Sequence, residues 1–436
     1  MHLNGRNLIL SISGGNVFTS FGGTEKVIIS HQHMFNANNI AYLYLYPVSK
    51  QWRNQELYRY WGMVFDGKFY GLYTTEQVVR IISNLISHDG GLLKIHIHHL
   101  KNVVMKELEH ILDEFLDVEI FFYGHDYYLI CEEYTLRNDE GKYCGEGLPC
   151  KQKCGDCNKY KFSHKAQQRR QLVDKYRDRM RLIVPSDAPA KIFRESIPDW
   201  SEKIQIVYHQ RQEGVYMGNR TPIPEKTKIK VAFCGLPSEI KGWNSWIDAV
   251  DSAVAQHSNI EFYHMGKSTK KHAHVMNVSV GFKTNELTMT EALRQHNIDC
   301  VVLWSQCPET YSYVYYECLA ANTFVITSRC SGNIAEQVKR NRTGIVLEND
   351  EQLRILLSDS SKLAQLINEM RENVPCGPSI LVENEEIVQL SKGEGYRVSQ
   401  ITNKSKGTIK KHIIETLYIW SLKRKNPTCK FGGKYD

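Results

Sequence analysis

Apolar residues along the first half of the chain fall in short runs that alternate with amphipathic stretches. The short runs are typical of buried strands, and the stretches between them repeat apolar residues every three or four positions, as helices do. Strand, helix and strand in this order predict a parallel sheet with helices on both faces. The predicted strands are Asn7–Ile12, Ala41–Leu45, Leu92–His96, Glu119–Phe122, Arg181–Pro185 and Lys203–Tyr208, and the predicted helices are Thr24–Phe35, Thr75–Ile86, Val103–Phe115 and Ala166–Arg181.

A second alternation of the same kind begins at Lys228. Residues 209–227, between the two alternations, have no apolar period and contain two prolines and two glycines, which is typical of a linker. A last helix is predicted over Thr408–Lys423, with its apolar residues on one face. The predicted elements of the second half are strands Ile229–Cys234, Glu261–Tyr263, Asp299–Trp304 and Phe324–Thr327, and helices Asn244–His257, Ser312–Ala321 and Ile334–Lys339.

The fold class that we expect is α/β, with two doubly wound Rossmann-like domains facing a cleft. A chain of 436 residues is too long for one ordinary core. Its 42% hydrophobic and 24% charged residues exclude disorder over most of its length. The expected parts are a first domain (1–208) with a Cys-rich insertion (131–163), the linker (209–227), a second domain (228–400), and a C-terminal helix with a basic tail (401–436).

Charge and hydropathy indicate where the protein acts. No apolar run approaches the roughly 18 residues of a membrane helix, and the stretch Leu8–Ile12 is a first strand rather than a signal peptide, so we expect a cytoplasmic protein. The net charge is +7, but Lys151–Arg181 alone carries eleven Lys/Arg against three Asp, and Lys404–Lys430 carries eight against one Glu. These segments are either solvated helix faces or surfaces for anionic lipid or nucleic acid. No nucleic-acid recognition motif accompanies them, which disfavours nucleic acid.

The segment Pro308–Gly344 carries the most informative chemistry. Glu309 precedes a predicted helix and Glu317 lies within it. Thr310, Tyr311 and Ser312 are at the helix start, where free N–H groups and the helix dipole attract an anion. Carboxylates accept hydrogen bonds from vicinal hydroxyls, so this arrangement suits a sugar nucleotide, with Glu309 at the sugar and Glu317 at the ribose.

The order of these motifs resembles the retaining glycosyltransferases of family 4, which have the two-domain GT-B fold. The family signature is Glu, seven residues, Glu, a small-residue turn, a buried strand and a Gly-containing loop. Three other motifs of the family, a glycine loop, a His-Asp pair and a phosphate-binding Lys-Gly, also have counterparts in this chain. The matching residues are Glu309, Glu317, Ala320–Asn322, Phe324–Thr327, Ser331–Asn333, Gly22–Glu25, His125-Asp126 and Lys241-Gly242. A second glycine pair, Gly14-Gly15, is an alternative for the glycine loop.

The resemblance implies transfer of a sugar from a nucleotide donor with retention of configuration. Lys241, the helix start and the amides of Gly22 and Gly23 would stabilise the leaving phosphate, which takes the proton of the acceptor, while His125 orients the sugar or the acceptor. No Asp-x-Asp pair is present, so we expect no cofactor for catalysis. Many members carry an Arg after the Gly of the strand that precedes Lys241, whereas here Leu236 follows Gly235. Arg329 or a backbone amide is the expected substitute for this second phosphate-binding cation.

Five cysteines cluster within 27 residues. Their spacing includes a Cys-x2-Cys step, which is a normal half of a zinc site, although iron–sulfur ligation and free or redox-active thiols remain alternatives. Some relatives of this group have a similar His-Asp-x4-Cys followed by a Cys cluster, and we expect a structural zinc ion with four ligands among the five. The candidate ligands are Cys131, Cys144, Cys150, Cys154 and Cys157. His96 and His98, on one face of a predicted strand, are interpreted as cleft-lining or structural residues rather than metal ligands.

The leading function is therefore a hexosyltransferase that uses a nucleotide-sugar and acts on a polysaccharide or lipid-linked glycan. The basic segment 151–181 would then face an anionic membrane surface, such as the inner face of the cell membrane. Two alternatives remain. A sugar-nucleotide epimerase would share the donor site but leave the Cys-rich insertion unexplained, and a non-catalytic scaffold of the same fold would explain the missing Arg.

Overall fold

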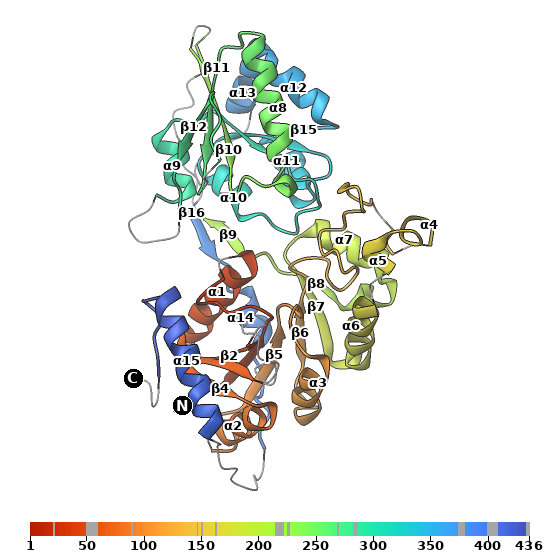
Figure 1. Cartoon of the computed structure of the whole chain (residues 1–436), viewed down its shortest axis with the longest axis vertical. Helices are drawn as coiled ribbons and strands as arrows, with labels where there is room; N and C mark the ends of the chain where they lie inside the picture. The colour runs from red at the N-terminus through yellow and green to blue at the C-terminus, as the bar shows by residue number, and fades with distance from the viewer. Residues whose placement is uncertain are drawn as a thin grey trace.

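The computed structural model has two α/β halves that follow one another along the long axis of the molecule (Figure 1). Cys150, Thr408 and most of the predicted linker lie outside the described residues. The structure describes residues 1–20, 22–48, 60–88, 90–145, 147–149, 151–161, 164–213, 222–224, 227–267, 270–281, 287–373, 380–398 and 409–432.

The first half is built on an eight-stranded sheet with the order β4-β3-β2-β1-β5-β6-β7-β8. All neighbours pair in parallel except β2 with β3 and β3 with β4, so the sheet is mixed rather than wholly parallel as the sequence pattern predicted. The strands are β1 (Leu8–Ile12), β2 (Ala41–Pro47), β3 (Trp61–Phe65), β4 (Lys68–Tyr73), β5 (Leu92–Ile97), β6 (Ile120–Tyr123), β7 (Met180–Val184) and β8 (Ile204–Ile206).

Both faces of this sheet are covered. Alternate residues of β1 enter opposite cores, Leu8 and Leu10 on one side and Ile9 on the other, because successive side chains of a strand point to opposite faces. Helices α2 (Thr75–His88) and α3 (Met105–Glu114) contribute to the core of Leu8, whereas α1 (Gly23–Ala37) contributes to that of Ile9. The remaining helices of this half are α4 (Lys151–Cys154), α5 (Asn158–Lys161), α6 (His164–Lys175) and α7 (Asp187–Ser196).

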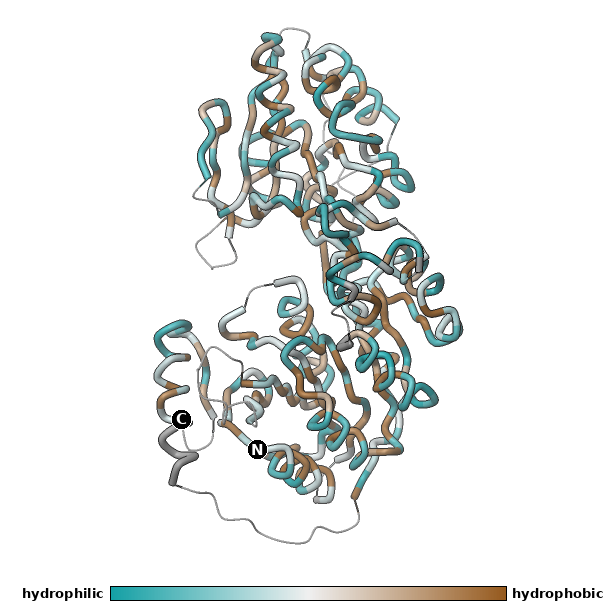
Figure 2. The backbone as a smooth tube through the Cα atoms, turned by 45° about the vertical axis from the view of Figure 1, so that its right-hand side comes forward, coloured by the Kyte–Doolittle hydropathy of each residue, from teal (hydrophilic) through white to brown (hydrophobic). Residues whose placement is uncertain are grey.

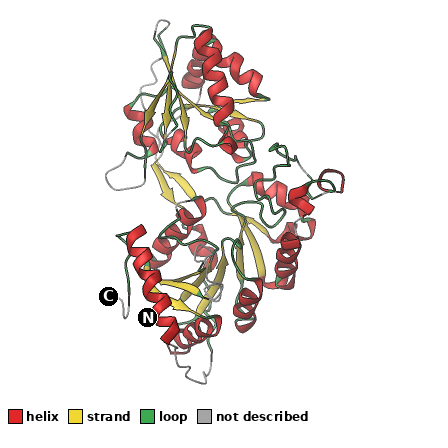
Figure 3. Ribbon diagram, viewed as in Figure 1, coloured by secondary structure: helices red, strands yellow, loops and turns green. Residues whose placement is uncertain are grey.

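The second half contains a wholly parallel six-stranded sheet with the order β12-β11-β10-β13-β14-β15 (Figure 3). Residues of α8, α12 and α13 pack on one face, and residues of α9, α10 and α11 on the other. The strands are β10 (Ile229–Cys234), β11 (Ile260–Met265), β12 (Val275–Val278), β13 (Cys300–Leu303), β14 (Phe324–Ser328) and β15 (Gly344–Leu347), and the helices are α8 (Trp243–Ala255), α9 (Met289–Gln295), α10 (Tyr313–Ala320), α11 (Asn333–Asn341), α12 (Asp350–Ser358) and α13 (Ser360–Asn373).

The chain passes twice between the halves. Strand β9 (Gln210–Glu213), at the start of the predicted linker, pairs antiparallel with β16 (Ile380–Glu383). After β16, helices α14 (Glu386–Ser391) and α15 (Ile409–Lys425) lie against the first half (Figure 1). The buried carboxylate of Glu415 in α15 accepts a hydrogen bond of 2.9 Å from the backbone N–H of Leu72. In Figure 2 hydrophobic colour is concentrated in the strands at the centre of each half. None of the helices that the structure describes is long and apolar enough to cross a membrane.

Candidate functional site

A pocket of about 680 Å³ lies where the carboxyl ends of strands from both halves meet. This volume is within the range of roughly 300–1,000 Å³ that small-molecule sites occupy. The first half contributes the start of α1 and the loop after β6, and the second half contributes the loops after β10 and β13 with the start of α10. Parallel sheets bind their ligands at this edge.

Gly22 and Gly23 line the pocket at the start of α1, whereas Gly14 and Gly15 do not line it. The carboxylate of Glu25 accepts a hydrogen bond of 2.9 Å from the N–H of Gly22 and so caps the helix. Of the two glycine pairs in the sequence, the second one therefore faces the pocket.

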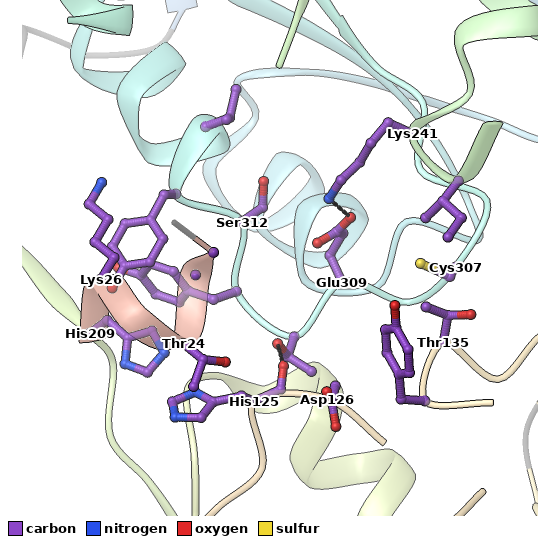
Figure 4. Close-up of a pocket in the computed structure, with 18 of the residues that line it drawn as sticks. Thr24, Lys26, His125, Asp126, Thr135, His209, Lys241, Cys307, Glu309 and Ser312 are labelled. Carbon is purple, nitrogen blue, oxygen red and sulfur yellow. Dashed lines mark hydrogen bonds and ion pairs between the residues drawn. The ribbon is translucent and has the colours of Figure 1, made fainter. Parts of the chain in front are cut away.

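Lys241 and Glu309 face one another across one end of the pocket (Figure 4). The ammonium of Lys241 donates to a carboxylate oxygen of Glu309, and the same oxygen accepts a hydrogen bond of 2.9 Å from Ser305 Oγ. Loss of solvent around the ammonium opposes its charge, but the Glu309 carboxylate outweighs that effect and raises the pKa of Lys241. Lys241 therefore carries its positive charge at neutral pH.

The backbone after Lys241 requires a glycine at position 242. Its φ of 78° lies in the left-handed region, and an added Cβ would sit 2.1 Å from the carbonyl oxygen of Trp304. The close approach holds the loop after β10 against the end of β13. Lys241 and Glu309, 68 residues apart in the chain, are thereby held at one place.

The loop that carries Glu309 is fixed from behind by Gly332 and Asn333, the glycine loop at the start of α11. The N–H of Asn333 donates to the carbonyl oxygen of Glu309 at 2.9 Å, and its side-chain amide donates to the carbonyl oxygen of Tyr311 at 2.6 Å. Gly332 has φ of 58°, and an added Cβ would lie 2.7 Å from both the nitrogen and the carbonyl oxygen of Glu309.

Thr310, Tyr311 and Ser312 follow Glu309 along the pocket wall. Thr310 Oγ1 donates to the carbonyl oxygen of His125 at 2.7 Å and so connects the two halves. The Tyr311 ring is buried and stacks on Tyr316 at 4.5 Å, so only part of Tyr311 faces the pocket. Ser312 is the N-cap of α10 and has a φ of 68°, which a non-glycine residue adopts rarely.

Glu317, on α10, also lines the pocket. It forms an ion pair of 3.5 Å with Lys26, a residue of α1 that the sequence analysis did not single out. Lys26 directly follows the Gly-Gly-Thr-Glu motif, which is the signal that could have identified it.

His125 and Asp126 form the wall of the pocket that belongs to the first half (Figure 4). Asp126 Oδ2 is 2.8 Å from His99 Nε2, and His125 Nε2 is 2.9 Å from His98 Nδ1. Burial, assisted by the neighbouring His209, holds the pKa of His125 well below its usual value. His125 is therefore neutral at pH 7.

Behind His125 lies a buried group of imidazoles. Among the described residues, His31, His96 and His98 have ligand atoms within 4.8 Å of one another. The Tyr123 hydroxyl is 3.1 Å from His96 Nδ1, and the His98 ring stacks on the Tyr123 ring. From the sequence, His96 and His98 were expected to be cleft-lining or structural, and neither lines the pocket.

The Cys-rich segment lies in the chain between strand β6 and helix α6. Cys154 is buried in the core of the first half, and Cys131 and Cys144 pack against the same core. Desolvation, followed by smaller effects of the other cysteines, raises the pKa of the Cys144 thiol to about 11. No three thiols of the four described cysteines lie within 4.8 Å of one another, so these four alone do not form a closed set of metal ligands. Cys150 lies outside the described residues.

Tyr134 and Thr135, from the same segment, line the pocket together with Cys307 and His209, and none of these four was predicted from the sequence.

Some of the basic residues of 151–181 make contacts within the protein. Arg169 is buried and pairs with Glu132 at 2.9 Å, and Arg179 donates to backbone carbonyls of α3 and the loop after it.

The chain is similar to known proteins in sequence family and in fold. Residues 228–372 match the family model described as "Glycosyl transferases group 1". Sucrose-phosphate synthase from Thermosynechococcus elongatus has a similar fold, with a TM-score of 0.53 and 13% identity, and the match covers 88% of this chain and 97% of that one. The pneumococcal O-GlcNAc transferase GtfA, solved in complex with UDP and GlcNAc, has a TM-score of 0.51 and 9% identity, over 96% of this chain and 99% of that one. The fold is therefore that of the GT-B glycosyltransferases, as expected. No curated protein sequence matches the chain.

Proposed function

We propose that this protein is a retaining glycosyltransferase that takes a hexose from a nucleotide-sugar and transfers it to a polysaccharide or lipid-linked glycan. The observation that carries the proposal is the pair of carboxylates, Glu309 and Glu317, which line one pocket and flank the start of α10 in the chain. The match of residues 228–372 to a glycosyltransferase family model supports it.

In this proposal each part of the pocket binds one part of the donor. Glu309 accepts hydrogen bonds from sugar hydroxyls, and Glu317 accepts them from the ribose. Negative charge develops on the leaving phosphate as the sugar bond breaks, and Lys241, the start of α10 and the amides of Gly22 and Gly23 stabilise it.

The role of His125 follows from its protonation state. A neutral imidazole can accept or donate one hydrogen bond at each nitrogen, and one nitrogen already faces His98. His125 orients the sugar or the acceptor hydroxyl, and the departing phosphate takes the acceptor proton. The reaction needs no metal cofactor in this scheme.

Residues from the Cys-rich segment support a transferase rather than a sugar-nucleotide epimerase. Tyr134 and Thr135 line the pocket on the side of the first half, where an acceptor would bind. An epimerase has no second substrate to place there. The acceptor is a glycan in this proposal, and the segment around α6 faces an anionic membrane when that glycan is lipid-linked.

A structural zinc ion would stabilise this segment. The donor set is suitable in chemistry, because thiolates are preferred zinc ligands. The four described cysteines do not form a complete set of zinc ligands as they lie, so zinc binding needs Cys150 or a movement of the segment. Four ligands from the five cysteines would fix Tyr134 and Thr135 next to the pocket.

The proposed function is tested with purified protein, a set of UDP-, GDP- and ADP-sugars, and release of the nucleoside diphosphate as the readout. Lys241→Ala should weaken binding of the diphosphate, because the phosphates lose a charge-assisted partner. Lys339→Ala, on the exposed surface of α11, is the matched control. Release of the nucleoside diphosphate that is lost in Lys241→Ala and kept in Lys339→Ala supports the proposal. Unchanged affinity in Lys241→Ala would place the phosphates elsewhere, and absence of release with every donor would favour a non-catalytic scaffold.

A further inference from the structure

The pocket contains a second lysine that bridges the two halves of the molecule. Lys26 Nζ lies 3.5 Å from Glu317 Oε1 and 4.0 Å from the centre of the Tyr313 ring. Lys26 is on α1, whereas Glu317 and Tyr313 are on α10. The two lysines of the pocket, Lys26 and Lys241, are thus each paired with one of the two carboxylates that bind the donor in the proposed function.

The position of Lys26 in its helix is electrostatically unfavourable. Its N–H donates to the carbonyl oxygen of Gly22 at 3.1 Å, so it lies in the first turn of α1. The N-terminus of a helix carries a partial positive charge and repels a nearby cation. Helix stability therefore does not explain a lysine here. An anion in the pocket would be attracted by both the helix N-terminus and the ammonium.

The expected second phosphate-binding cation is missing from the loop after β10. Leu236 occupies that place and is 67% exposed. Arg329, the substitute considered from the sequence, pairs with Glu348 at 3.3 Å and does not line the pocket. Among the described residues that line the pocket, the lysines and arginines are Lys26 and Lys241.

We propose that Lys26 is the second phosphate-binding cation of this site. Lys241 contacts the phosphate nearest the sugar, and Lys26 contacts the phosphate nearest the ribose. In Figure 4, Ser312 lies between the two lysines. This inference rests on the proposed function, because it needs a nucleoside diphosphate in the pocket.

The contacts of Lys26 fit such a role. An ammonium has three donors, so it can keep one contact with Glu317 while it reaches a phosphate oxygen. Its flexible four-carbon stem allows the movement. The Tyr313 ring holds the ammonium near this place by a cation–π contact before the nucleotide binds. Because Lys26 comes from the first half and Glu317 from the second, one ligand would join both halves.

The experiment compares two ligands by calorimetry: the diphosphate that the wild-type protein binds among UDP, GDP and ADP, and the corresponding nucleoside. Lys26→Met should bind the diphosphate about tenfold or more weakly, the effect of losing a charge-assisted contact. It should bind the nucleoside within about twofold of wild type, because the ribose contact with Glu317 does not need the phosphates. Lys26→Arg should restore most of the diphosphate affinity.

Lys106→Met is the matched control, because Lys106 is an exposed lysine in the first turn of α3 outside the pocket. It should bind both ligands as the wild type does. Equal loss of diphosphate and nucleoside in Lys26→Met would show that Lys26 only positions Glu317, and unchanged diphosphate affinity would show that Lys26 has no part in binding. Either result overturns the inference and leaves the proposed function standing. A wild-type protein that binds no diphosphate overturns both.

Discussion

Gly332→Ala should distort the site at Glu309 through the backbone alone. Gly332 adopts φ of 58° with ψ of −122°, a combination that L-residues rarely adopt, and holding alanine there costs about 1–3 kcal/mol. The new Cβ would also lie 2.7 Å from the nitrogen and carbonyl oxygen of Glu309 and 2.8 Å from the carbonyl carbon of Pro308. Because all of these are backbone atoms, the loop that carries Glu309 must move. Overpacking of this kind costs a further 1–3 kcal/mol or so.

The substitution should therefore lower the free energy of unfolding by about 2–6 kcal/mol in total. Gly147→Ala is the matched control, because Gly147 also has a positive φ of 72° but has no atom within 4 Å of an added Cβ. That variant should lose only the backbone contribution of about 1–2 kcal/mol. The difference between the two variants measures the clash with the Glu309 loop together with the backbone strain specific to Gly332.

Urea unfolding followed by tryptophan fluorescence measures both variants, and donor turnover is measured in parallel. Gly332→Ala should have the lower urea midpoint and should lose turnover by about a hundredfold, since a displacement of 1 Å at a reacting group has that order of effect. A midpoint equal to that of Gly147→Ala, with wild-type turnover, would refute the proposed dependence of Glu309 on the Gly332 contact.

Four other predictions follow from the same structure. Glu309→Gln should lower turnover at least about tenfold, as one positioned polar group typically does, and wild-type turnover would exclude its role. Burial, together with the charge of Lys94, lowers the pKa of His96 to about 3. The neutral His96 side chain therefore stabilises the folded protein fully above about pH 6.5, the pKa of histidine in the unfolded chain. This stabilisation is lost as the pH falls toward 3. Between pH 7.5 and 5.5 this loss is about 1.4 kcal/mol; melting curves of His96→Phe should show a weaker pH dependence, and an unchanged one would contradict the assignment. Metal analysis should find about one zinc per chain, and less than about half an equivalent would contradict the zinc proposal. A chain ending before Thr408 should melt at a lower temperature, because it loses the Glu415 bond to Leu72, and equal stability would contradict the importance of that contact.

The sequence pattern predicted the strands that lie in the middle of the two sheets. β1 and β10 are short apolar runs with helices nearby in the chain, and their period is visible locally. The β3–β4 hairpin was missed, although its Asp66-Gly67 turn, with both φ angles positive, is a strong hairpin signal between two apolar runs. The β9–β16 pair was missed for another reason, since it joins a short polar segment, QRQE, to a short apolar one, ILVE, far away in the sequence. Such pairing leaves no local period to detect.

The residues of the candidate site were also only partly predictable from the sequence. Glu309, Glu317 and Lys241 could be singled out because each lies in a recognisable local motif. Lys26 directly follows such a motif and was still missed, because a lysine on a helix has the same sequence appearance whether it faces solvent or a partner 291 residues away. The backbone requirement at Gly332 was also hidden, since it depends on the approach of the Glu309 loop.

The central claim is that the pocket between the halves binds a nucleoside diphosphate and its sugar. Thermal unfolding of the purified protein with UDP, GDP, ADP and their common sugar conjugates tests it most directly, because a ligand that binds the folded state raises the melting temperature. We predict a clear rise with one diphosphate and its sugar, and loss of that rise in Glu317→Ala. No rise with any of these ligands, or an equal rise in Glu317→Ala, would contradict the assignment of the pocket.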